Sequence, residues 1–165
     1  DLHVIYSPHS FMTNKERYGV VVMMKARSGK FLVVRGNKEN EGKEEMHSFV
    51  DNAFKDVSGQ EFPGGGVKKS EEVDVRLAAI RETWEEAWLK LSQSQLVDAN
   101  FGTHISQKDR GDFRVHVLEA KLTLLQEIWL KLFFGAMEVV ANGGLNDVIR
   151  PRDQILLNLA WKNSL

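Results

Sequence analysis

The sequence predicts a protein of the α/β class, in the broad sense that includes α+β folds, in which a mixed β-sheet lies between helices. Three observations carry this prediction: two apolar strand-like runs within residues 18–35, a long helical pattern after a glycine run within residues 62–91, and further strands followed by a closing helix. A chain of 165 residues with 42% hydrophobic content is enough for one domain with a core. We therefore expect residues 1–165 to form a single domain.

The first strands are predicted to form a hairpin. Residues 18–25 and 31–35 are rich in β-branched and apolar residues, and Ser28-Gly29 between them is a turn signal. Because both runs are nearly all apolar, we expect burial on both faces of the sheet. Residues 1–17 have no such pattern and are expected to be an irregular lead or an edge strand.

The second half predicts strands and then helix. Residues 113–120 alternate as a strand does, with residues 100–105 as an expected hairpin partner. Residues 122–134 are apolar with a period that fits either strand or helix. We expect them to contribute to the core, and the alternatives are a dimer surface and a wall on which a ligand stacks. A closing helix is expected to begin at residues 150–153. Its inner face would consist of Ile155, Leu156, Leu159 and Ala160.

Residues 36–60 are predicted to be an insertion or a lid loop, because this connection is longer than most loops in compact domains. Residues 47–54 within it could form a short helix. Its candidate ligand-binding side chains are Lys38, Lys43 and Lys55 for phosphates and Phe49 or Phe54 for a base. The alternative interpretation is a solvated insertion without a binding role.

The stretch from Phe62 to Leu91 is the part around which the chain is organised. It begins with the glycine run 64–66, which cannot continue a helix or form an ordinary strand interior. A helical pattern follows, with an apolar stripe on one side. The stripe consists of Val73, Leu77, Ile80, Trp84, Ala87, Trp88 and Leu91. On the opposite side, three carboxylates at positions i, i+3 and i+4 (Glu82, Glu85 and Glu86) converge on one patch.

Three neighbouring carboxylates repel one another, and a bound cation would reverse that cost. Mg²⁺ prefers oxygen ligands and commonly binds one or two carboxylates together with substrate phosphates. The glycine run adds bare backbone that a phosphate or a metal can approach closely. The residues therefore indicate a divalent-metal site for phosphate chemistry. For the helix alone, the alternative is an ordinary solvated face.

The same stretch resembles the Nudix box, G-x5-E-x7-R-E-U-x-E-E-x-G-U, where U is a bulky aliphatic residue. Gly65-x5-Glu71 matches its opening, residues 81–89 match most of its close, and residues 61–64 resemble the usual lead-in. Nine residues separate Glu71 from Arg81 where the pattern has seven. Glu72 is therefore an alternative to Glu71, and we expect a looser first helical turn to absorb the extra residues.

Two further departures from the box lie in the helix. Thr83 stands in place of a bulky aliphatic residue, and Trp88 stands in place of glycine. Since Trp88 lies at the edge of the apolar stripe, we expect it to extend the helix past its usual end.

The resemblance implies a Nudix-like α/β/α sandwich and a hydrolase that cleaves a nucleoside diphosphate linked to another moiety. It implies Mg²⁺, or Mn²⁺, on Glu85 and Glu86, with Glu82 as ligand or as base, Glu71 as a further ligand, and Gly65 against the metal. Arg81 would hold a box carboxylate in place. Glu119 and Glu138 are the candidates for a further downstream base, and the sequence does not choose between them.

Substrate phosphates are expected to meet the glycine run, Gly64, Gly65 and Gly66, and Arg35 at the end of its strand; for Arg35, an exposed salt bridge is the alternative. The alternative function is a Nudix-fold sensor that binds a nucleotide or an ADP-ribose-like ligand without cleaving it. An enzyme similar to isopentenyl-diphosphate isomerase is disfavoured, because that family relies on a catalytic cysteine and this chain has none.

Composition limits the partners. A net charge of −1 provides no basic field for nucleic acid, and the absence of cysteine excludes disulfides and thiol catalysis. The sequence contains no apolar run long enough for a membrane span and no signal-peptide pattern, so we expect a cytoplasmic protein. The resemblance also implies a homodimer.

Overall fold

The computed structural model describes residues 2–5, 17–35, 59–101, 103–108, 111–144 and 148–165. Its strands are β1 (Leu2–Ile5), β2 (Arg17–Lys25), β3 (Phe31–Arg35), β4 (Gln60–Glu61), β5 (Gly64–Gly66), β6 (Leu96–Asp98), β7 (Thr103–Lys108), β8 (Gly111–Lys121) and β9 (Met137–Val139). Its helices are α1 (Val75–Ala87), α2 (Leu124–Phe133) and α3 (Pro151–Ser164), with 3₁₀ turns η4 (Lys69–Glu71) and η5 (Gln93–Gln95). No helix in these ranges is long and apolar enough to cross a membrane.

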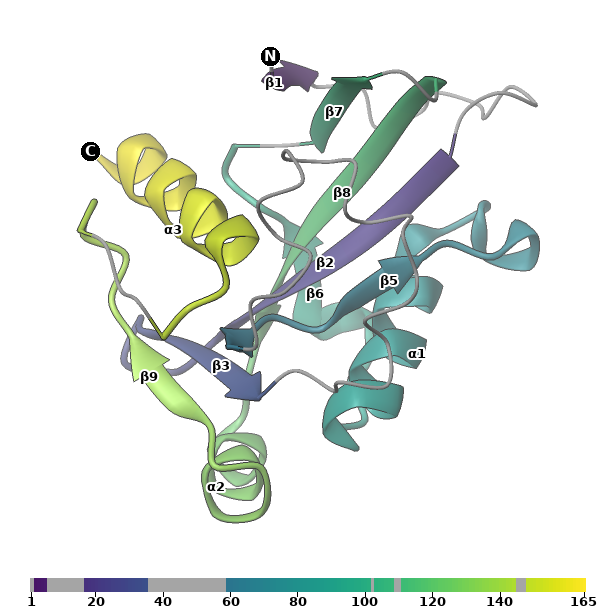
Figure 1. Ribbon diagram of the computed structural model, residues 1–165. Coiled ribbons are helices and arrows are strands. Elements are labelled where there is room, and N and C mark those ends of the chain that lie inside the picture. Colours follow the sequence, from purple (N-terminus) through teal and green to yellow (C-terminus); the bar gives the residue numbers. More distant parts are fainter. Residues whose placement is uncertain (1, 6–16, 36–58, 102, 109–110, 145–147) are drawn as a thin grey trace.

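The strands form a mixed sheet, as the sequence predicts. Its order is β1-β7-β8-β2-β3-β4, with β5 beside β2, β6 beside β8 and β9 beside β3. Strands β2 and β8 are parallel over the whole of β2, and the other strand pairs are antiparallel. Figure 1 shows β2 and β8 as the two long strands side by side. The expected hairpin of β2 and β3 and the expected pairing of β7 with β8 are confirmed, and β1 is an edge strand.

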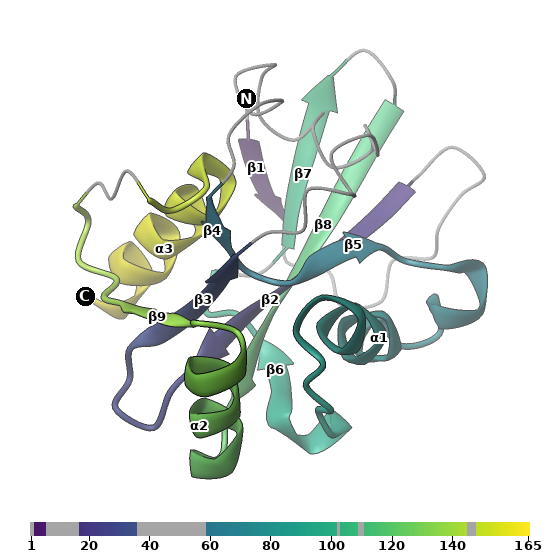
Figure 2. The same ribbon diagram turned by 60° about the horizontal axis from the view of Figure 1, so that its bottom comes forward.

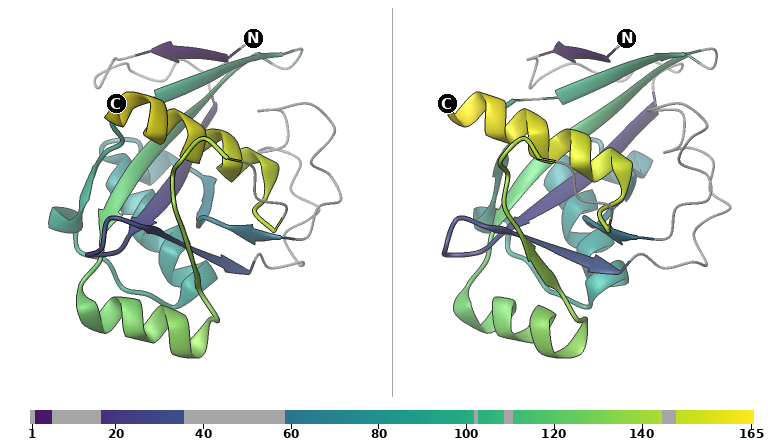
Figure 3. Two further views of the ribbon diagram at one scale, coloured as in Figure 1. Left: turned by 90° about the vertical axis from the view of Figure 1, so that its left-hand side faces the viewer. Right: turned by 60° about the vertical axis from the view of Figure 1, so that its left-hand side comes forward.

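Strand β2 lies at the centre of the fold, because both of its faces are buried. Residues 20–24 have no solvent exposure. Val20, Val22 and Met24 belong to the core cluster shared with α1 and α2, whereas Val21 and Met23 belong to the cluster shared with α3. Figures 2 and 3 show α1 and α3 on opposite sides of the sheet. The sheet therefore lies between helices, which confirms the predicted architecture.

Helix α1 turns a different face to the sheet from the one that the sequence predicts. Most of the expected apolar stripe is exposed, including Trp84 at 55% and Trp88 at 65%. The buried side carries Ala78, Ala79, Glu82, Thr83 and Ala87. The small side chains of the two alanines let the helix approach the sheet closely. The helix therefore buries the face that carries small side chains and exposes the face that carries large ones. This places Glu82 between the helix and the sheet.

The apolar segment after β8 forms α2 and contributes less to the core than expected. Within this helix the buried side chains are Glu127 and Leu130. Its outer side is apolar and exposed, consisting of Leu124, Leu125, Ile128, Leu132 and Phe133. Thr123 begins the helix, its hydroxyl accepting a hydrogen bond from the Gln126 N–H at 3.3 Å. Helix propensity and this cap therefore override the strand alternative.

The closing helix α3 begins within the predicted residues. Pro151 occupies its first turn, where the missing N–H costs nothing. Its buried apolar side chains are Leu156, Leu157 and Ala160, while Ile155 and Leu159 are only half-buried. The inner face is thus rotated by part of a turn from the predicted one. Of the expected insertion 36–60, the structure describes Gly59 and Gln60; the other residues lie outside the described ranges.

Thr83 leads to a stability prediction. Its side chain is fully buried, and among the described residues its hydroxyl has no hydrogen-bond partner. An unsatisfied buried hydroxyl costs about 1–3 kcal/mol, so we expect Thr83→Val, which keeps the shape, to raise the free energy of unfolding by about 1 kcal/mol. The urea midpoint measures this. The same substitution at the capping residue, Thr123→Val, should lower stability by about 1 kcal/mol. A loss of stability in both variants would mean that Thr83 has a partner.

Candidate active site

The glycine run, which the sequence does not predict to be an ordinary strand interior, forms the short strand β5. Residues 64–66 pair antiparallel with β2, with Gly64 opposite Val21 and Gly65 opposite Val20. A Cβ atom on Gly64 would lie 2.7 Å from the carbonyl oxygen of Val20, so only glycine allows this approach. The run is thus held against the centre of the sheet, facing α1.

Arg81 forms hydrogen bonds to several residues of the box, and we call its guanidinium group with these partners the Arg81 hub. Its Nε and Nη2 donate to the two carboxylate oxygens of Glu71, each at 2.9 Å. Nη1 donates to Glu82 at 2.6 Å and to Glu85 at 3.3 Å, and Nη2 also donates to the carbonyl oxygen of Gly66 at 2.8 Å. One guanidinium therefore ties the helix, the upstream turn and the glycine strand together.

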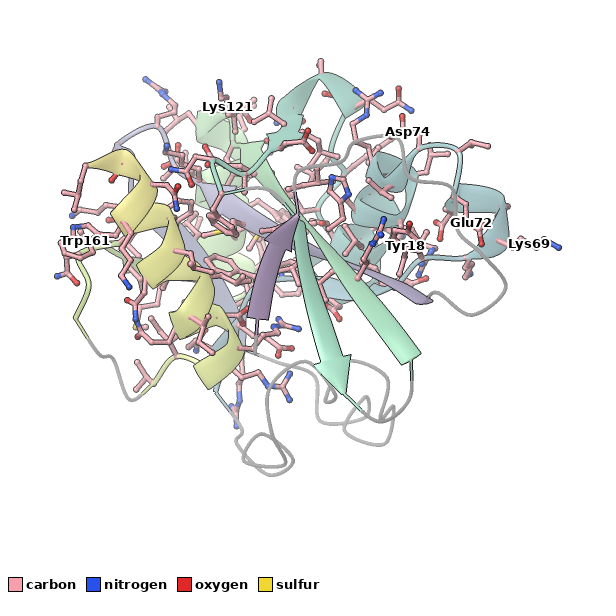
Figure 4. All side chains as sticks on the ribbon, turned by 90° about the horizontal axis from the view of Figure 1, so that it is seen from above. Tyr18, Lys69, Glu72, Asp74, Lys121 and Trp161 are labelled. Atoms are coloured by element: carbon pink, nitrogen blue, oxygen red, sulfur yellow. The ribbon has the colours of Figure 1, made fainter. Side chains whose placement is uncertain are left out.

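The structure brings Glu71, and not Glu72, to this hub. Glu71 lies in η4 and is buried, whereas Glu72 is exposed. Figure 4 shows Glu72 and Lys69 at the outer edge of the molecule, on the far side from Trp161 of α3. The extra residues form the turn between η4 and the helix cap, Asp74, so Glu71 still reaches Arg81. This agrees with the expectation that a looser first turn would absorb them.

The helix ends where the box pattern places its glycine, so the expected extension past Trp88 is wrong. Helix α1 stops at Ala87, and Trp88 adopts a left-handed conformation with φ 48° and ψ 33°. Glycine favours this conformation, and a bulky residue is rare in it. The exposed indole packs edge-on against Phe134, with ring centroids 6.1 Å apart.

Two box carboxylates lie against the glycine strand. A Cβ atom on Gly65 would overlap the carboxylate of Glu82. The N–H of Gly64 donates to Glu86 Oε2 at 3.0 Å. Glu82 is buried and Glu86 is half-buried, whereas Glu85 is exposed. The three predicted carboxylates thus range from buried to exposed to solvent.

A further acid, Glu61, lies beside them. Burial, followed by the charge of Glu61, raises the pKa of Glu86 to about 8. Burial also raises the pKa of Glu82, against the hydrogen bond and charge of Arg81. For Glu71, burial acts to raise the pKa, but the hydrogen bonds from Arg81 and Lys68 outweigh it and lower the pKa. Glu82 and Glu86 therefore hold their protons more tightly than ordinary glutamates do, whereas Glu71 gives up its proton more readily.

The start of α3 supplies residues that the sequence did not point to as part of a site. Arg150 pairs with Glu61, and Arg152 pairs with the buried Asp153. Both pairs lie against residues 61 and 62, about 90 positions earlier in the chain. In the sequence, residues 150–153 indicate only a helix start, because spacing within one segment carries no information on such distant contacts.

Other predicted residues lie outside this cluster. Arg35 is exposed at the end of β3, opposite Gln60. Glu119 pairs with Lys25 at 3.3 Å, and Glu138 pairs with Lys131 and with Lys30. The structure therefore favours neither candidate as a downstream base. The candidate binding residues Lys38, Lys43, Lys55, Phe49 and Phe54 lie outside the described residues.

The donor set fits a hard divalent cation in its chemistry. The acids around Gly65 offer oxygen ligands alone, which Mg²⁺ prefers. Glu86 is a carboxylate beside two other acids, an arrangement that a cation would stabilise. Within the described residues, however, three or more acidic or histidine side chains are nowhere gathered as in a preformed metal site. Arg81 accounts for this in part, because it holds Glu82 and Glu85.

Comparisons with known proteins agree with the geometry. A family model of the NUDIX domain matches residues 15–131. The pyrophosphohydrolase BsRppH of Bacillus subtilis, solved as a point mutant, aligns with a TM-score of 0.58 and 18% identity over 99% of this chain and 88% of that chain. The ORF135 protein of E. coli aligns with a TM-score of 0.55 and 19% identity over 88% of each chain. The comparison with curated proteins gave no match. At these identities the two structures support the fold.

Proposed function

The chain belongs to the Nudix hydrolase superfamily, and from this premise we propose that it is a Mg²⁺-dependent enzyme that cleaves the diphosphate linkage of a nucleoside diphosphate joined to another moiety. The observation that carries the proposal is the contact of Glu82 and Glu86 with the glycine strand, beside the Arg81 hub. Such an arrangement presents carboxylates and bare backbone to a metal-bound diphosphate.

Each residue has a distinct role in the proposal. Glu85 and Glu86 would hold the metal together with Gly65, and Glu71 would be a further ligand. Glu82 is a ligand or the base that takes a proton from the attacking water. Bound Mg²⁺ would neutralise the diphosphate and lower the pKa of the water. Arg81 orients the carboxylates, since its hydrogen bonds to Glu71 and Glu82 fix both side chains.

The substrate side is proposed from position. Arg35 and the glycine strand would meet the phosphates. The N–H of Gly64 donates to Glu86 and the carbonyl oxygen of Gly66 accepts from Arg81. In this proposal the two groups act on substrate through the side chains that they hold, and the exposed Arg35, which lies outside the cluster of acids, would contact a phosphate directly.

The decisive experiment measures hydrolysis of nucleoside triphosphates, ADP-ribose, nucleotide sugars and dinucleoside polyphosphates with Mg²⁺, with Mn²⁺ and with EDTA. We expect metal-dependent turnover that falls about a hundredfold or more in Glu85→Gln. Glu72→Gln is the matched control, because Glu72 is an exposed neighbour of the hub. Unchanged activity of Glu85→Gln would show that the metal ligands are assigned wrongly. Ligand-induced thermal stabilisation without any turnover would favour a sensor.

Two finer expectations remain predictions. A cytoplasmic location is tested by fractionation, and a homodimer by sedimentation velocity. The exposed apolar side of α2 supports the second.

A further inference from the structure

We propose that Arg152 and Asp153, in the first turn of α3, are positioning residues of the active site. Together they bracket the main chain of Phe62 and thereby fix the glycine strand on which Glu82 and Glu86 rest. The inference rests on the proposed function, because it assigns these two residues a role in holding the metal-binding side chains.

The bracket consists of four hydrogen bonds. Asp153 Oδ2 accepts the N–H of Phe62 at 3.0 Å, and Arg152 Nη2 donates to the carbonyl oxygen of Phe62 at 3.0 Å. The two side chains are joined to each other by Arg152 Nε to Asp153 Oδ1 at 2.9 Å and by Arg152 Nη2 to Asp153 Oδ2 at 3.1 Å. The backbone N–H and C=O of Phe62 are thus both held by the Arg152–Asp153 ion pair.

Phe62 needs such partners because it lies between two strands with different neighbours. Residues 60–61 pair with β3, and residues 64–66 pair with β2. The side chain of Phe62 is fully buried and packs edge-on against Phe31 at 6.1 Å. A buried N–H and C=O without partners are costly, and Arg152 and Asp153 supply what the sheet does not.

The presence of a buried ion pair indicates that Arg152 and Asp153 position the main chain of Phe62 and do not merely satisfy its hydrogen-bonding groups. Asp153 is fully buried and Arg152 is 8% exposed. Burying two charges costs free energy, and well-packed apolar residues are often as stable as a buried pair. An arginine fork joined to a carboxylate, however, sets the distance and the orientation of its partner. The pair therefore holds Phe62 in one place.

The bracketed residue, Phe62, lies two positions before Gly64, which contacts the proposed metal ligand Glu86. The carbonyl oxygen of Pro63, the next residue, accepts the N–H of Val22 at 2.8 Å. Gly64 follows and donates to Glu86. On the other side of Phe62, Arg150 pairs with Glu61, and Figure 2 shows the start of α3 beside β4. A displacement of Phe62 would pass directly to Gly64 and Glu86, and a misplacement of about 1 Å can cost about a hundredfold in rate.

The test compares Asp153→Asn and Arg152→Lys with Leu157→Val. Asparagine keeps the shape of Asp153 without its charge, and lysine keeps the charge of Arg152 without its fork. Leu157 is a buried residue of the same helix in the apolar core, so its substitution loosens α3 without touching the bracket. Amide hydrogen exchange of Phe62 and Gly64 in the metal-free protein, Mn²⁺ affinity by electron paramagnetic resonance, and kcat and KM are measured for each.

We expect Asp153→Asn to speed the exchange of both amides at least about tenfold and to weaken Mn²⁺ binding about tenfold, with kcat falling more than KM rises. Leu157→Val should lower the melting temperature and leave Mn²⁺ affinity unchanged. For Arg152→Lys, the amide exchange rates, the Mn²⁺ affinity and kcat should lie between the values for wild type and those for Asp153→Asn.

Unchanged Gly64 exchange and Mn²⁺ affinity in Asp153→Asn would overturn the proposal, as would wild-type behaviour of Arg152→Lys, which would show that charge alone suffices. If Asp153→Asn does not fold, Arg152→Lys decides by the same measurements. A wild-type protein that neither binds Mn²⁺ nor hydrolyses any substrate would refute the proposed function. The exchange rates of Phe62 and Gly64 would still show whether the bracket positions the strand.

Discussion

Glu86→Gln is expected to stabilise the metal-free protein at about pH 8.5 and, in the same variant, to abolish metal-dependent hydrolysis. Burial and the neighbouring Glu61 raise the pKa of Glu86 to about 8, from an ordinary value of 4.5. The ionised side chain is therefore unfavourable in the folded protein without a cation. Glutamine has nearly the same shape, carries no charge and can still accept the hydrogen bond from Gly64.

The direction of the pH dependence follows from the raised pKa. Between pH 4.5 and about 8 the folded protein keeps a proton on Glu86 that the unfolded chain has lost. The contribution of this group to stability is thus fully present below pH 4.5, declines as pH rises, and levels off above about 8. Glu86→Gln lacks this decline, so its advantage grows with pH and reaches about 2 kcal/mol for the half-buried side chain.

Urea unfolding between about pH 5 and 9 in EDTA measures the difference, and Glu85→Gln is the matched control. Glu85 is exposed, so its substitution should reduce activity without the pH-dependent gain in stability. Addition of Mg²⁺ should stabilise the wild type more at high pH, where Glu86 gives up its proton readily, and should not do so in Glu86→Gln. Equal pH profiles for Glu86→Gln and wild type would show that Glu86 ionises normally in the folded protein.

The sequence was informative where local pattern decides the structure. The β-branched runs of β2 and β3 predict strands buried on both faces, and residues 20–24 are fully buried. The resemblance of residues 65–89 to the Nudix box implies that Arg81 holds a box carboxylate, and Arg81 donates to Glu82 and to Glu85. Both cases depend on contacts between residues close in the chain or on a strong periodic signal.

The hydrophobic pattern gave a wrong prediction for the buried face of α1, where close packing against the sheet competes with the burial of large apolar side chains. The apolar stripe of α1 contains larger side chains than its buried side, yet Ala78 and Ala79 face the sheet. Burying Trp84 there would hold the helix away from the glycine strand and separate Glu82 from Gly65. Close approach of helix and strand is therefore achieved at the cost of exposed apolar surface, and a sum of hydrophobicity along one face cannot predict it.

The contacts of α3 with the site lie beyond sequence reasoning for a different reason. Residues 152 and 153 meet Phe62 across about 90 positions of chain, and neither segment alone carries a signal for the other. Buried charges paired through backbone groups are specified by the fold as a whole. A helix start that contains both an arginine and an aspartate is compatible with ordinary capping, which is how its sequence is interpreted without the structure.

Gly65→Ala is expected to reduce activity about a hundredfold with only a small loss of stability. The backbone of Gly65 is not in the left-handed region, because the positive φ angles of glycine in the described chain occur at Gly29, Gly135 and Gly143. Alanine is therefore permitted by conformation and excluded by space, since its Cβ would overlap the carboxylate of Glu82. That carboxylate is the end of a flexible side chain, so it can swing away and leave the protein folded, but the acid is then misplaced.

Gly64→Ala is the contrasting variant. Its Cβ would meet the carbonyl oxygen of Val20 at 2.7 Å, within the backbone of the central strand, which cannot move aside cheaply. We expect it to lower the free energy of unfolding by about 1–3 kcal/mol. A double-mutant cycle of Gly65→Ala with Glu82→Gln identifies the cause: if alanine acts by displacing Glu82, the loss of activity in the double variant should be close to that of Glu82→Gln alone. Additive losses would mean that the Cβ at position 65 obstructs the metal or the substrate itself, which would place the reacting phosphate directly against the glycine strand.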